Sequence, residues 1–230
     1  MKNMKKGLLV VALGCVFGAS CLSQKSKPVS ADTQESVADT VPSTVKNNSG
    51  KALVVYFSVP ETDGVDASSG ASRVVANGKT MGSTQYVASV IKESTGGDIF
   101  EIKTKRTYPG THEALIEAAR EEADAKARPE LVSHIKNLQD YDIVFVGFPN
   151  WWYDMPMPLY TFFDEYDFSG KTIIPFCTHG GSRFSDAVKT IRSMEQKATV
   201  LDGYAIARED VPESKDDVLK WLGRIGMKTK

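Results

Sequence analysis

The chain has 230 residues, of which 41% are hydrophobic and 25% charged, and this is enough for one globular domain with appendages. The formal net charge of −1 excludes the strongly basic surface that is typical of nucleic-acid-binding proteins. Three cysteines, at positions 15, 21 and 177, leave little scope for a disulfide framework. We therefore expect a domain that binds no nucleic acid, and we predict no metal site.

The first 20 residues have the pattern of a secretory signal peptide. Residues 1–6 contain three lysines and no acid, residues 7–17 are apolar but too short to span a bilayer, and small residues follow from Gly18. Cys21 comes directly after them, which resembles the cleavage site of bacterial lipoproteins, although that family usually has leucine where this chain has Gly18. We expect Cys21 to be the lipidated first residue of an exported chain that is anchored to a membrane of the cell envelope. A plain secretory signal with an incidental cysteine is the alternative.

Residues 21–50 are expected to form the lipid anchor and a flexible tether, because they are rich in Ser, Thr, Lys, Pro and Asn and show no apolar period. The folded domain is expected to occupy residues 51–230. Removal of residues 1–20 leaves 25 basic and 29 acidic residues, so the mature chain is mildly acidic, with a net charge of −4.

Strand-like and helix-like patterns alternate five times along this domain. The expected strands are 52–57, 99–102, 141–148, 172–177 and 198–206. The expected helices are 83–95, 111–126, 156–166, 185–196 and one that begins at 214. Because crossovers between parallel strands are right-handed, this alternation predicts an α/β fold, a doubly wound five-stranded parallel sheet in the order 2-1-3-4-5 with helices on both faces.

Three adjacent aromatic residues lie in the loop after the third strand. The loop consists of Pro149, Asn150, Trp151, Trp152 and Tyr153. Open α/β sheets bind ligands at the carboxyl ends of their strands, and aromatic rings can stack on a planar group. We predict a planar ligand at this loop; the alternative is that the three rings only cap the core.

Two other loops are predicted to reach the same edge of the sheet. The loop after the fourth strand contains Thr178, His179, Gly180, Gly181 and Ser182, and its two glycines allow a ligand to approach the backbone closely. The loop after the first strand begins at Ser58 and reaches the next helix at Gly82, Ser83, Thr84 and Gln85. Hydroxyl groups and N–H groups at a helix start are suited to binding a phosphate.

The first loop is unusually long, since it runs from residue 58 to residue 82. Asn77-Gly78 between short extended segments predicts a β-hairpin within it. The tripeptide from Gly78 to Thr80 is also typical of the end of a nucleotide-triphosphate loop, but Arg73 stands where that motif needs glycine. The glycine pattern of a dinucleotide site is missing as well, so the sequence does not support an NAD site.

Together these residues resemble the flavodoxins, in particular the flavodoxin-like lipoproteins. The resemblance covers roughly residues 51 to 206 and is carried by segments 55–58, 82–84, 146–152, 154–156 and 178–182. It implies non-covalently bound FMN. Ser58, Gly82, Ser83 and Thr84, with Gln85 beside them, would then hold the phosphate, residues 149–153 would line one side of the flavin ring, and residues 178–182 would line the other edge.

The resemblance implies a redox flavoprotein at the cell envelope, either an electron carrier or a small reductase of the quinone or nitro type, whose redox partner the sequence does not identify. Relatives commonly carry glycine after the Trp-Trp pair, and any other residue costs on the order of 1–2 kcal/mol at positive φ. Tyr153 would therefore hinder the backbone turn that supports one-electron chemistry, which favours two-electron reduction. The alternative is an extracytoplasmic binding module that keeps the fold without using a cofactor.

The remaining polar residues of interest are expected to matter less. His179 could hydrogen-bond the flavin or serve only its own loop. His112 and His134 are expected on polar helix surfaces in contact with solvent. Cys177 is expected to pack at the end of a strand.

Overall fold

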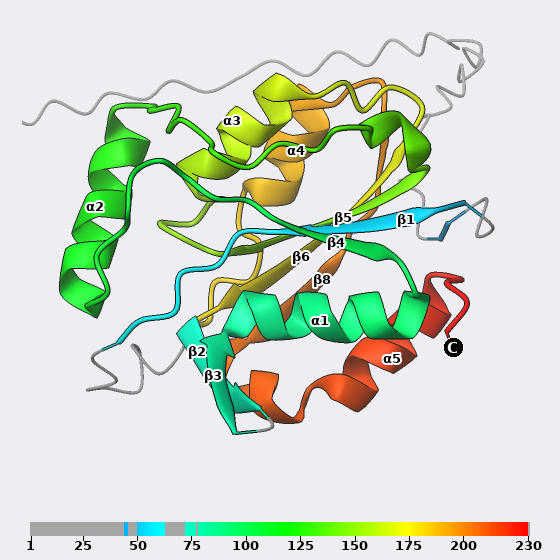
Figure 1. Ribbon diagram of the computed structural model, residues 1–230, viewed down its shortest axis with the longest axis horizontal. Coiled ribbons are helices and arrows are strands. Elements are labelled where there is room, and N and C mark those ends of the chain that lie inside the picture. The colour runs from blue at the N-terminus through cyan, green and yellow to red at the C-terminus, as the bar shows by residue number, and fades with distance from the viewer. Residues whose placement is uncertain (1–43, 46–49, 63–71, 77, 230) are drawn as a thin grey trace, which may run out of the picture. The chain divides into compact units, whose positions relative to one another are not determined.

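A computed structural model describes residues 44–45, 50–62, 72–76 and 78–229 (Figure 1). The predicted signal peptide, Cys21, most of the predicted tether and Asn77 lie outside the described residues. Val45 is buried, and its N–H donates to the carbonyl of Ile225 at 2.9 Å, so contacts of the domain extend back to this residue. None of the helices formed by the described residues is long and apolar enough to cross a bilayer.

The described residues form a parallel sheet in the predicted order, and this confirms the predicted fold class. The strands of this sheet are β1 (Ala52–Tyr56), β4 (Asp98–Glu101), β5 (Ile143–Pro149), β6 (Thr172–His179), β7 (Thr199–Val200) and β8 (Tyr204–Ala207). Their order is β4-β1-β5-β6, followed by β7 and β8, which both pair with β6. Counting β7 and β8 as one interrupted strand gives the order 2-1-3-4-5.

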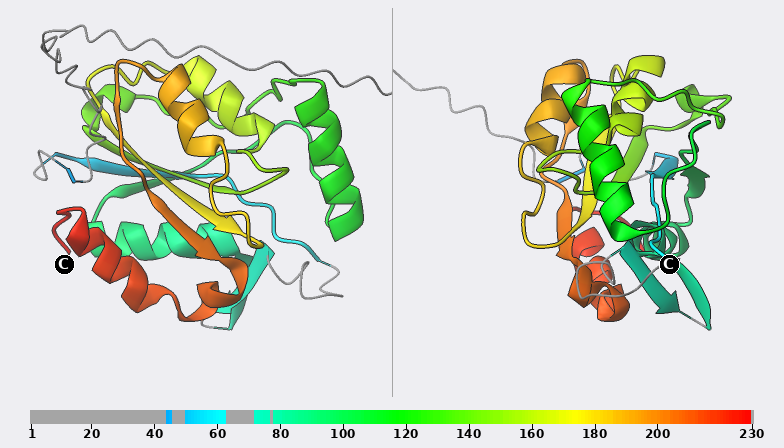
Figure 2. Two further views of the ribbon diagram at one scale, coloured as in Figure 1. Left: turned by 180° about the vertical axis from the view of Figure 1, so that it is seen from behind. Right: turned by 90° about the vertical axis from the view of Figure 1, so that its left-hand side faces the viewer.

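Helices cover both faces of the sheet (Figures 1 and 2). They are α1 (Ser83–Thr95), α2 (His112–Asp124), α3 (Met157–Glu165), α4 (Ala187–Met194) and α5 (Lys215–Arg224). Alternate residues of β1 point to opposite faces, so Val54 packs with residues of α1 and α5 whereas Val55 packs with residues of α3 and α4. Both valines are fully buried, which explains why the central strands are apolar at every position.

Helix α2 differs from the others in its placement. Both figures show it beyond the carboxyl ends of the strands rather than flat against a face of the sheet. It packs there through Leu115, and its buried Glu122 accepts a hydrogen bond from the Tyr108 hydroxyl at 2.7 Å. As a result, one wall of the space above the strand ends is helical.

The predicted hairpin in the first loop is confirmed. Strands β2 (Arg73–Ala76) and β3 (Lys79–Gly82) are antiparallel, with Ala76 opposite Lys79, and Gly78 takes a positive φ of 72° in the turn. The hairpin ends directly at α1, so it delivers the chain from the first loop to the start of that helix.

The predicted single strand over residues 198–206 is wrong in one respect, because β7 and β8 are separated by residues 201–203. Gly203 has a φ of 79°, and a Cβ atom there would lie 2.2 Å from the carbonyl oxygen of Pro175. The chain turns at this glycine against β6, and pairing with β6 then resumes at β8.

Candidate functional site

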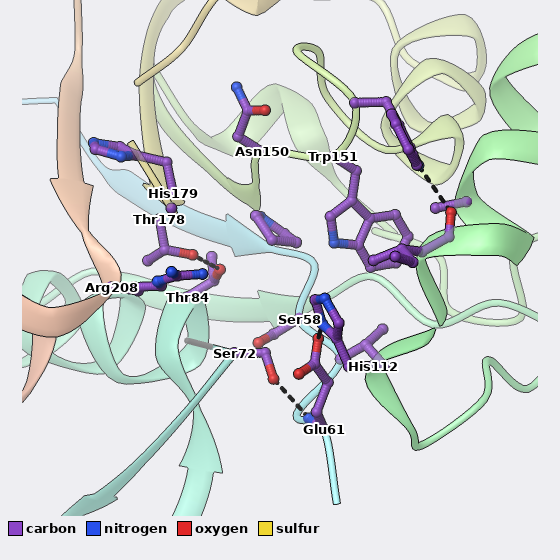
Figure 3. Close-up of a pocket in the computed structure, with 16 residues that line it drawn as sticks. Ser58, Glu61, Ser72, Thr84, His112, Asn150, Trp151, Thr178, His179 and Arg208 are labelled. Carbon is purple, nitrogen blue, oxygen red and sulfur yellow. Dashed lines mark hydrogen bonds and ion pairs between the residues drawn. The ribbon is translucent and has the colours of Figure 1, made fainter. Parts of the chain in front are cut away.

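A cavity of about 150 Å³ lies at the carboxyl ends of the strands (Figure 3). The loops after β1, β5 and β6 converge there, as the parallel sheet requires, and α2 and the segment after β8 complete its walls. Nine of the predicted site residues border it: Ser58, Thr84, Pro149, Asn150, Trp151, Trp152, Thr178, His179 and Gly180. Six others adjoin these residues in the sequence but do not border the cavity: Gly82, Ser83, Gln85, Tyr153, Gly181 and Ser182.

The start of α1 forms a hydroxyl-rich end of the cavity. Thr84 is only 1% exposed, and its hydroxyl lies 2.9 Å from the hydroxyl of Thr178. This contact joins the start of α1 to the carboxyl end of β6. Ser58 packs against Gly82 so closely that a Cβ atom on this glycine would lie 2.0 Å from its Oγ atom. The first turn of α1 contains no acidic residue, so its N–H groups present an undiminished positive dipole end.

The aromatic loop is a tight turn held by two reciprocal hydrogen bonds. The N–H of Trp151 donates to the carbonyl of Asp154 at 3.0 Å, and the N–H of Asp154 donates to the carbonyl of Trp151 at 3.1 Å. The two central residues, Trp152 and Tyr153, have φ values of 51° and 66°. A turn with both central residues at positive φ is normally built from glycine and asparagine, so two aromatic residues there are unusual.

The three aromatic side chains are placed differently. The Trp151 ring is anchored by edge contacts to the Phe57 and Tyr108 rings, with centroids 5.5 Å away in both cases. The Trp152 indole donates to the carbonyl of Ile116 on α2 at 2.8 Å. Tyr153 is 67% exposed and does not border the cavity. The alternative of three rings that only cap the core therefore does not hold for Tyr153.

Thr178 and His179 were expected in a loop but are the last two residues of β6, and His179 presents a neutral ring there. The N–H of Gly181 donates to the Nδ1 atom of His179 at 3.0 Å. Burial, and then the neighbouring Arg183 guanidinium, hold the pKa of the His179 imidazole below its ordinary value. The ring is therefore neutral near pH 7, with its proton on Nε2.

Seven residues that border the cavity were not expected at the site: Val59, Glu61, Ser72, His112, Ile116, Ala119 and Arg208. His112, the first residue of α2, faces the cavity rather than solvent alone, so the expectation of a solvated helix surface is wrong for it. His134, by contrast, is exposed, although it lies in a loop rather than a helix. Arg208 follows β8, and a Cβ atom on Gly180 would lie 2.9 Å from its Nη1 atom. Arg208 lies two residues after the predicted strand 198–206, and this position was the signal that could have identified it.

Cys177 is fully buried in β6, as expected. Burial raises the pKa of its thiol, so the sulfur stays protonated and unreactive at neutral pH. The site therefore offers hydroxyls and helix N–H groups at one end, a cation from Arg208, and the indole of Trp151. This set suits a planar group that carries a phosphate.

The sequence matches the family model described as flavodoxin over residues 72–225. No curated protein sequence matches the chain at a significant level. A candidate flavoprotein from Bacteroides uniformis is 30% identical, with a TM-score of 0.54, and the match covers 71% of this chain and 96% of that one.

Two further solved structures are similar in fold. A candidate flavoprotein from Bacteroides eggerthii is 24% identical, with a TM-score of 0.59, over 78% of this chain and 99% of that one. A flavoprotein from Lactobacillus acidophilus, solved in complex with FMN, is 19% identical, with a TM-score of 0.51, over 75% of this chain and 98% of that one.

Proposed function

The chain belongs to the flavodoxin family, and we propose that it binds FMN and works as a small two-electron reductase at the cell envelope. The observation that carries this proposal is the cavity itself, where the hydroxyl-rich start of α1 and the Trp151 indole line one space. Bound FMN would supply the reversible uptake of one or two electrons.

The residues present fit this cofactor. Phosphate would be held by the Ser58 and Thr84 hydroxyls and by the N–H groups at the start of α1, where no acidic residue opposes it. Gly82 has no Cβ atom to fill the space beside Ser58. The flavin ring would be placed between the aromatic turn and residues 178–180, which the Asn150 N–H joins by donating to the carbonyl of Thr178 at 2.8 Å.

The aromatic turn favours two-electron chemistry over one-electron transfer. With both central residues at positive φ, rotation of the peptide between them would leave Trp152 in a conformation normally reserved for glycine. The hindrance that the sequence assigned to Tyr153 therefore falls on Trp152. A backbone that switches only at this cost would give little added support to one-electron chemistry of bound FMN.

The location rests on the sequence alone. The lysine-rich start, the short apolar run and the small residues before Cys21 favour export and lipidation. The second candidate function, a binding module that has kept the fold without a cofactor, is suited to the same location.

Titration of the full chain with FMN, FAD, NAD and riboflavin tests the proposed cofactor. We expect FMN to bind in the micromolar range or tighter and to give a yellow protein, whereas no visible absorbance and no FMN binding would support the binding module. Tight binding of FAD or NAD in place of FMN would contradict the proposal.

The Thr84→Ala variant tests the phosphate end. One lost hydrogen bond should weaken FMN binding by about 1 kcal/mol or more, while riboflavin, which has no phosphate, should bind as before. Thr95→Ala is the matched control, because Thr95 lies at the other end of the same helix and bonds the carbonyl of Ile91. Equal losses for FMN and riboflavin would show that Thr84 only supports the fold.

A further inference from the structure

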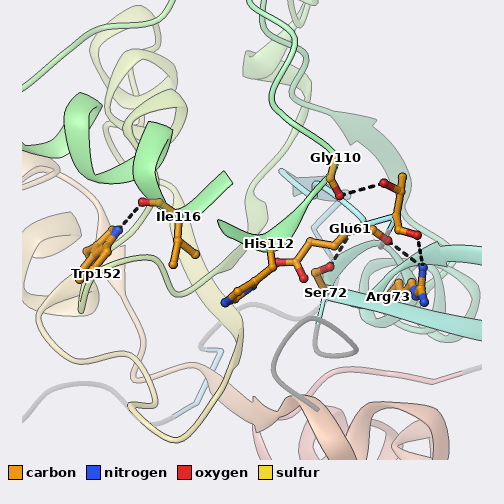
Figure 4. A network of polar contacts seen from close by, with 8 residues as sticks. Glu61, Ser72, Arg73, Gly110, His112, Ile116 and Trp152 are labelled. Atoms are coloured by element: carbon orange, nitrogen blue, oxygen red, sulfur yellow. Dashed lines mark hydrogen bonds and ion pairs between the residues drawn. The ribbon is translucent and has the colours of Figure 1, made fainter. Parts of the chain in front are cut away.

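A buried carboxylate and a histidine form a pair at the edge of the cavity (Figure 4). Glu61, in the loop after β1, is 6% exposed, and its Oε1 atom lies 3.0 Å from the Nδ1 atom of His112. His112 is the first residue of α2, so the pair joins two segments that are 51 residues apart. Burial of a carboxylate is unfavourable unless hydrogen bonds compensate it.

The backbone around Glu61 is fixed from three directions. Its N–H donates to the Ser72 hydroxyl at 2.7 Å, and its carbonyl accepts from the Arg73 guanidinium at 3.1 Å. The N–H of Thr62 donates to the carbonyl of Gly110, two residues before His112, at 2.6 Å. The carboxylate is thus held in place beside the imidazole by the hairpin and by the approach to α2.

This geometry determines how the imidazole presents its protons. A carboxylate that accepts the Nδ1 proton fixes the ring orientation and leaves Nε2 on the opposite side of the ring as the position that gains and loses a proton. The His112 side chain is 29% exposed and borders the same cavity as Asn150 and Trp151. It therefore lies at the proposed cofactor site while it remains able to exchange protons with solvent.

The charges around the pair favour proton transfer over phosphate binding. When His112 is protonated, Glu61 neutralises it, so the pair carries no net charge that would attract an anion. Arg208 borders the cavity as a cation, and His179 borders it as a neutral ring. Arg73 engages the Glu61 carbonyl rather than the carboxylate.

We infer that His112, oriented by Glu61, donates a proton to the carbonyl oxygen of a quinone-type acceptor reduced in this cavity, an inference that rests on the proposed function. Reduced FMN, when bound, would supply the acceptor with two electrons and one proton and would itself be oxidised. The acceptor takes its second proton from Nε2 of His112, so that a C=O group becomes C–OH and the quinone becomes a hydroquinone. His112 then regains a proton from solvent.

A single-turnover experiment on the full chain tests this role. The FMN-loaded chain is reduced by light with EDTA as the electron donor in the absence of oxygen, and is then mixed either with a benzoquinone or with ferricyanide, which accepts electrons without protons. The loss of a general acid typically slows a reaction by about 100-fold or more, so His112→Gln should slow oxidation by the quinone on that scale and leave oxidation by ferricyanide unchanged. His134→Gln is the matched control, because His134 also pairs through Nδ1 with a glutamate, Glu165, but at the exposed surface away from the cavity.

A second measurement needs no cofactor. Nitrogen NMR of the imidazole side chains should show the Nδ1–H tautomer for His112 in the unloaded chain, and Glu61→Met, which removes the acceptor, should abolish it. Survival of that tautomer in Glu61→Met would overturn the pairing.

The outcomes separate this inference from the proposed function. An absence of FMN binding would overturn the proposed function itself. If FMN binds, equal slowing with both acceptors, or slowing with neither, would overturn the proton-donor role alone. A His112→Gln variant that binds FMN more than about tenfold more weakly, a loss of about 1.4 kcal/mol, would show that the pair holds the cofactor instead.

Discussion

Trp152 and Tyr153 have backbone conformations that L-residues rarely adopt. A residue other than glycine at positive φ costs on the order of 1–2 kcal/mol, and both residues show it at 51° and 66°. The reciprocal hydrogen bonds between Trp151 and Asp154, together with the Trp152 bond to α2, hold this turn in place. Strain of this kind is typical of functional sites.

The strain at Tyr153 can be measured by comparing two substitutions. Tyr153→Gly and Tyr153→Ala both remove an exposed ring, so their difference isolates the backbone. Because glycine accepts positive φ and alanine does not, we expect Tyr153→Gly to be more stable than Tyr153→Ala by about 1 kcal/mol in the free energy of unfolding. Urea denaturation measures this difference. A Tyr153→Ala variant at least as stable as Tyr153→Gly would contradict the left-handed turn.

Glu195, at the end of α4, is a residue whose protonation should affect stability. Burial first, and then the charges of Asp167 and Asp164, raise the pKa of its carboxyl from 4.5 to about 7. The folded state therefore binds this proton more tightly than the unfolded state, so the group lowers stability progressively as the pH rises from about 4.5 through 7.

Glu195→Gln removes this effect. At pH 8 we expect the free energy of unfolding of the variant to exceed that of the parent chain by on the order of 1 kcal/mol, after allowance for solvent screening. The variant should therefore unfold at a higher temperature than the parent chain at this pH. At pH 4.5 the two should unfold together, since Glu195 is then protonated in the folded state. A stabilisation that does not change with pH would contradict the raised pKa.

At the scale of single residues, the site could be predicted from the sequence only in part. Ser58 and Trp151 lie two residues after β1 and β5, and Thr178 lies near the carboxyl end of β6, so the parallel sheet brings the three together. His112 was not predictable in this way, because its position depends on α2 standing beyond the strand ends. Its partner Glu61 lies in a loop whose path is determined by contacts with the hairpin and with Gly110.

Among the elements, buried strands and amphipathic helices were predictable because their apolar periods differ. The ends of α1 were also predictable, since Gly96 at its carboxyl end adopts the left-handed conformation that glycine favours. The interruption between β7 and β8 was not, because nothing in the local pattern of residues 198–206 shows that Gly203 must pack against the backbone of β6.

Gly203→Ala tests this element. A Cβ atom 2.2 Å from the Pro175 carbonyl oxygen cannot be accommodated without movement of the β6 backbone, and φ is positive as well. We expect a loss of more than about 2 kcal/mol in the free energy of unfolding, from the conformational penalty and the clash together. Gly78→Ala is the control, because Gly78 has a similar φ of 72° but no atom within 4 Å of the added carbon. It should lose only the conformational part, about 1 kcal/mol, and equal losses in the two variants would show that the close approach to β6 does not matter.

At the scale of the whole molecule, the strand order follows from the alternation of elements and from right-handed crossovers. This order places the loops after β1, β5 and β6 at one edge of the sheet, which is why a cavity exists there. What the alternation could not predict is the orientation of α2, because a crossover helix is expected to lie on a face of the sheet. Its position across the strand ends gives this domain a histidine at the mouth of the site.

The location of the whole chain gives the last prediction. Residues 1–6 are basic, residues 7–17 are apolar, and Cys21 follows small residues, so export should be followed by cleavage before Cys21 and by its acylation. Two lipid signals or more give stable anchoring, and a multiply acylated cysteine meets that condition. We therefore expect the expressed chain in the membrane fraction, with a mature N-terminus at a lipid-modified Cys21 by mass spectrometry.

Cys21→Ser should move the chain to the soluble fraction, whereas Cys15→Ser, which changes a cysteine inside the apolar run, should leave it in the membrane fraction. An unmodified N-terminus elsewhere, or release by Cys15→Ser in place of Cys21→Ser, would overturn the anchor at Cys21 without affecting the proposed chemistry of the cavity.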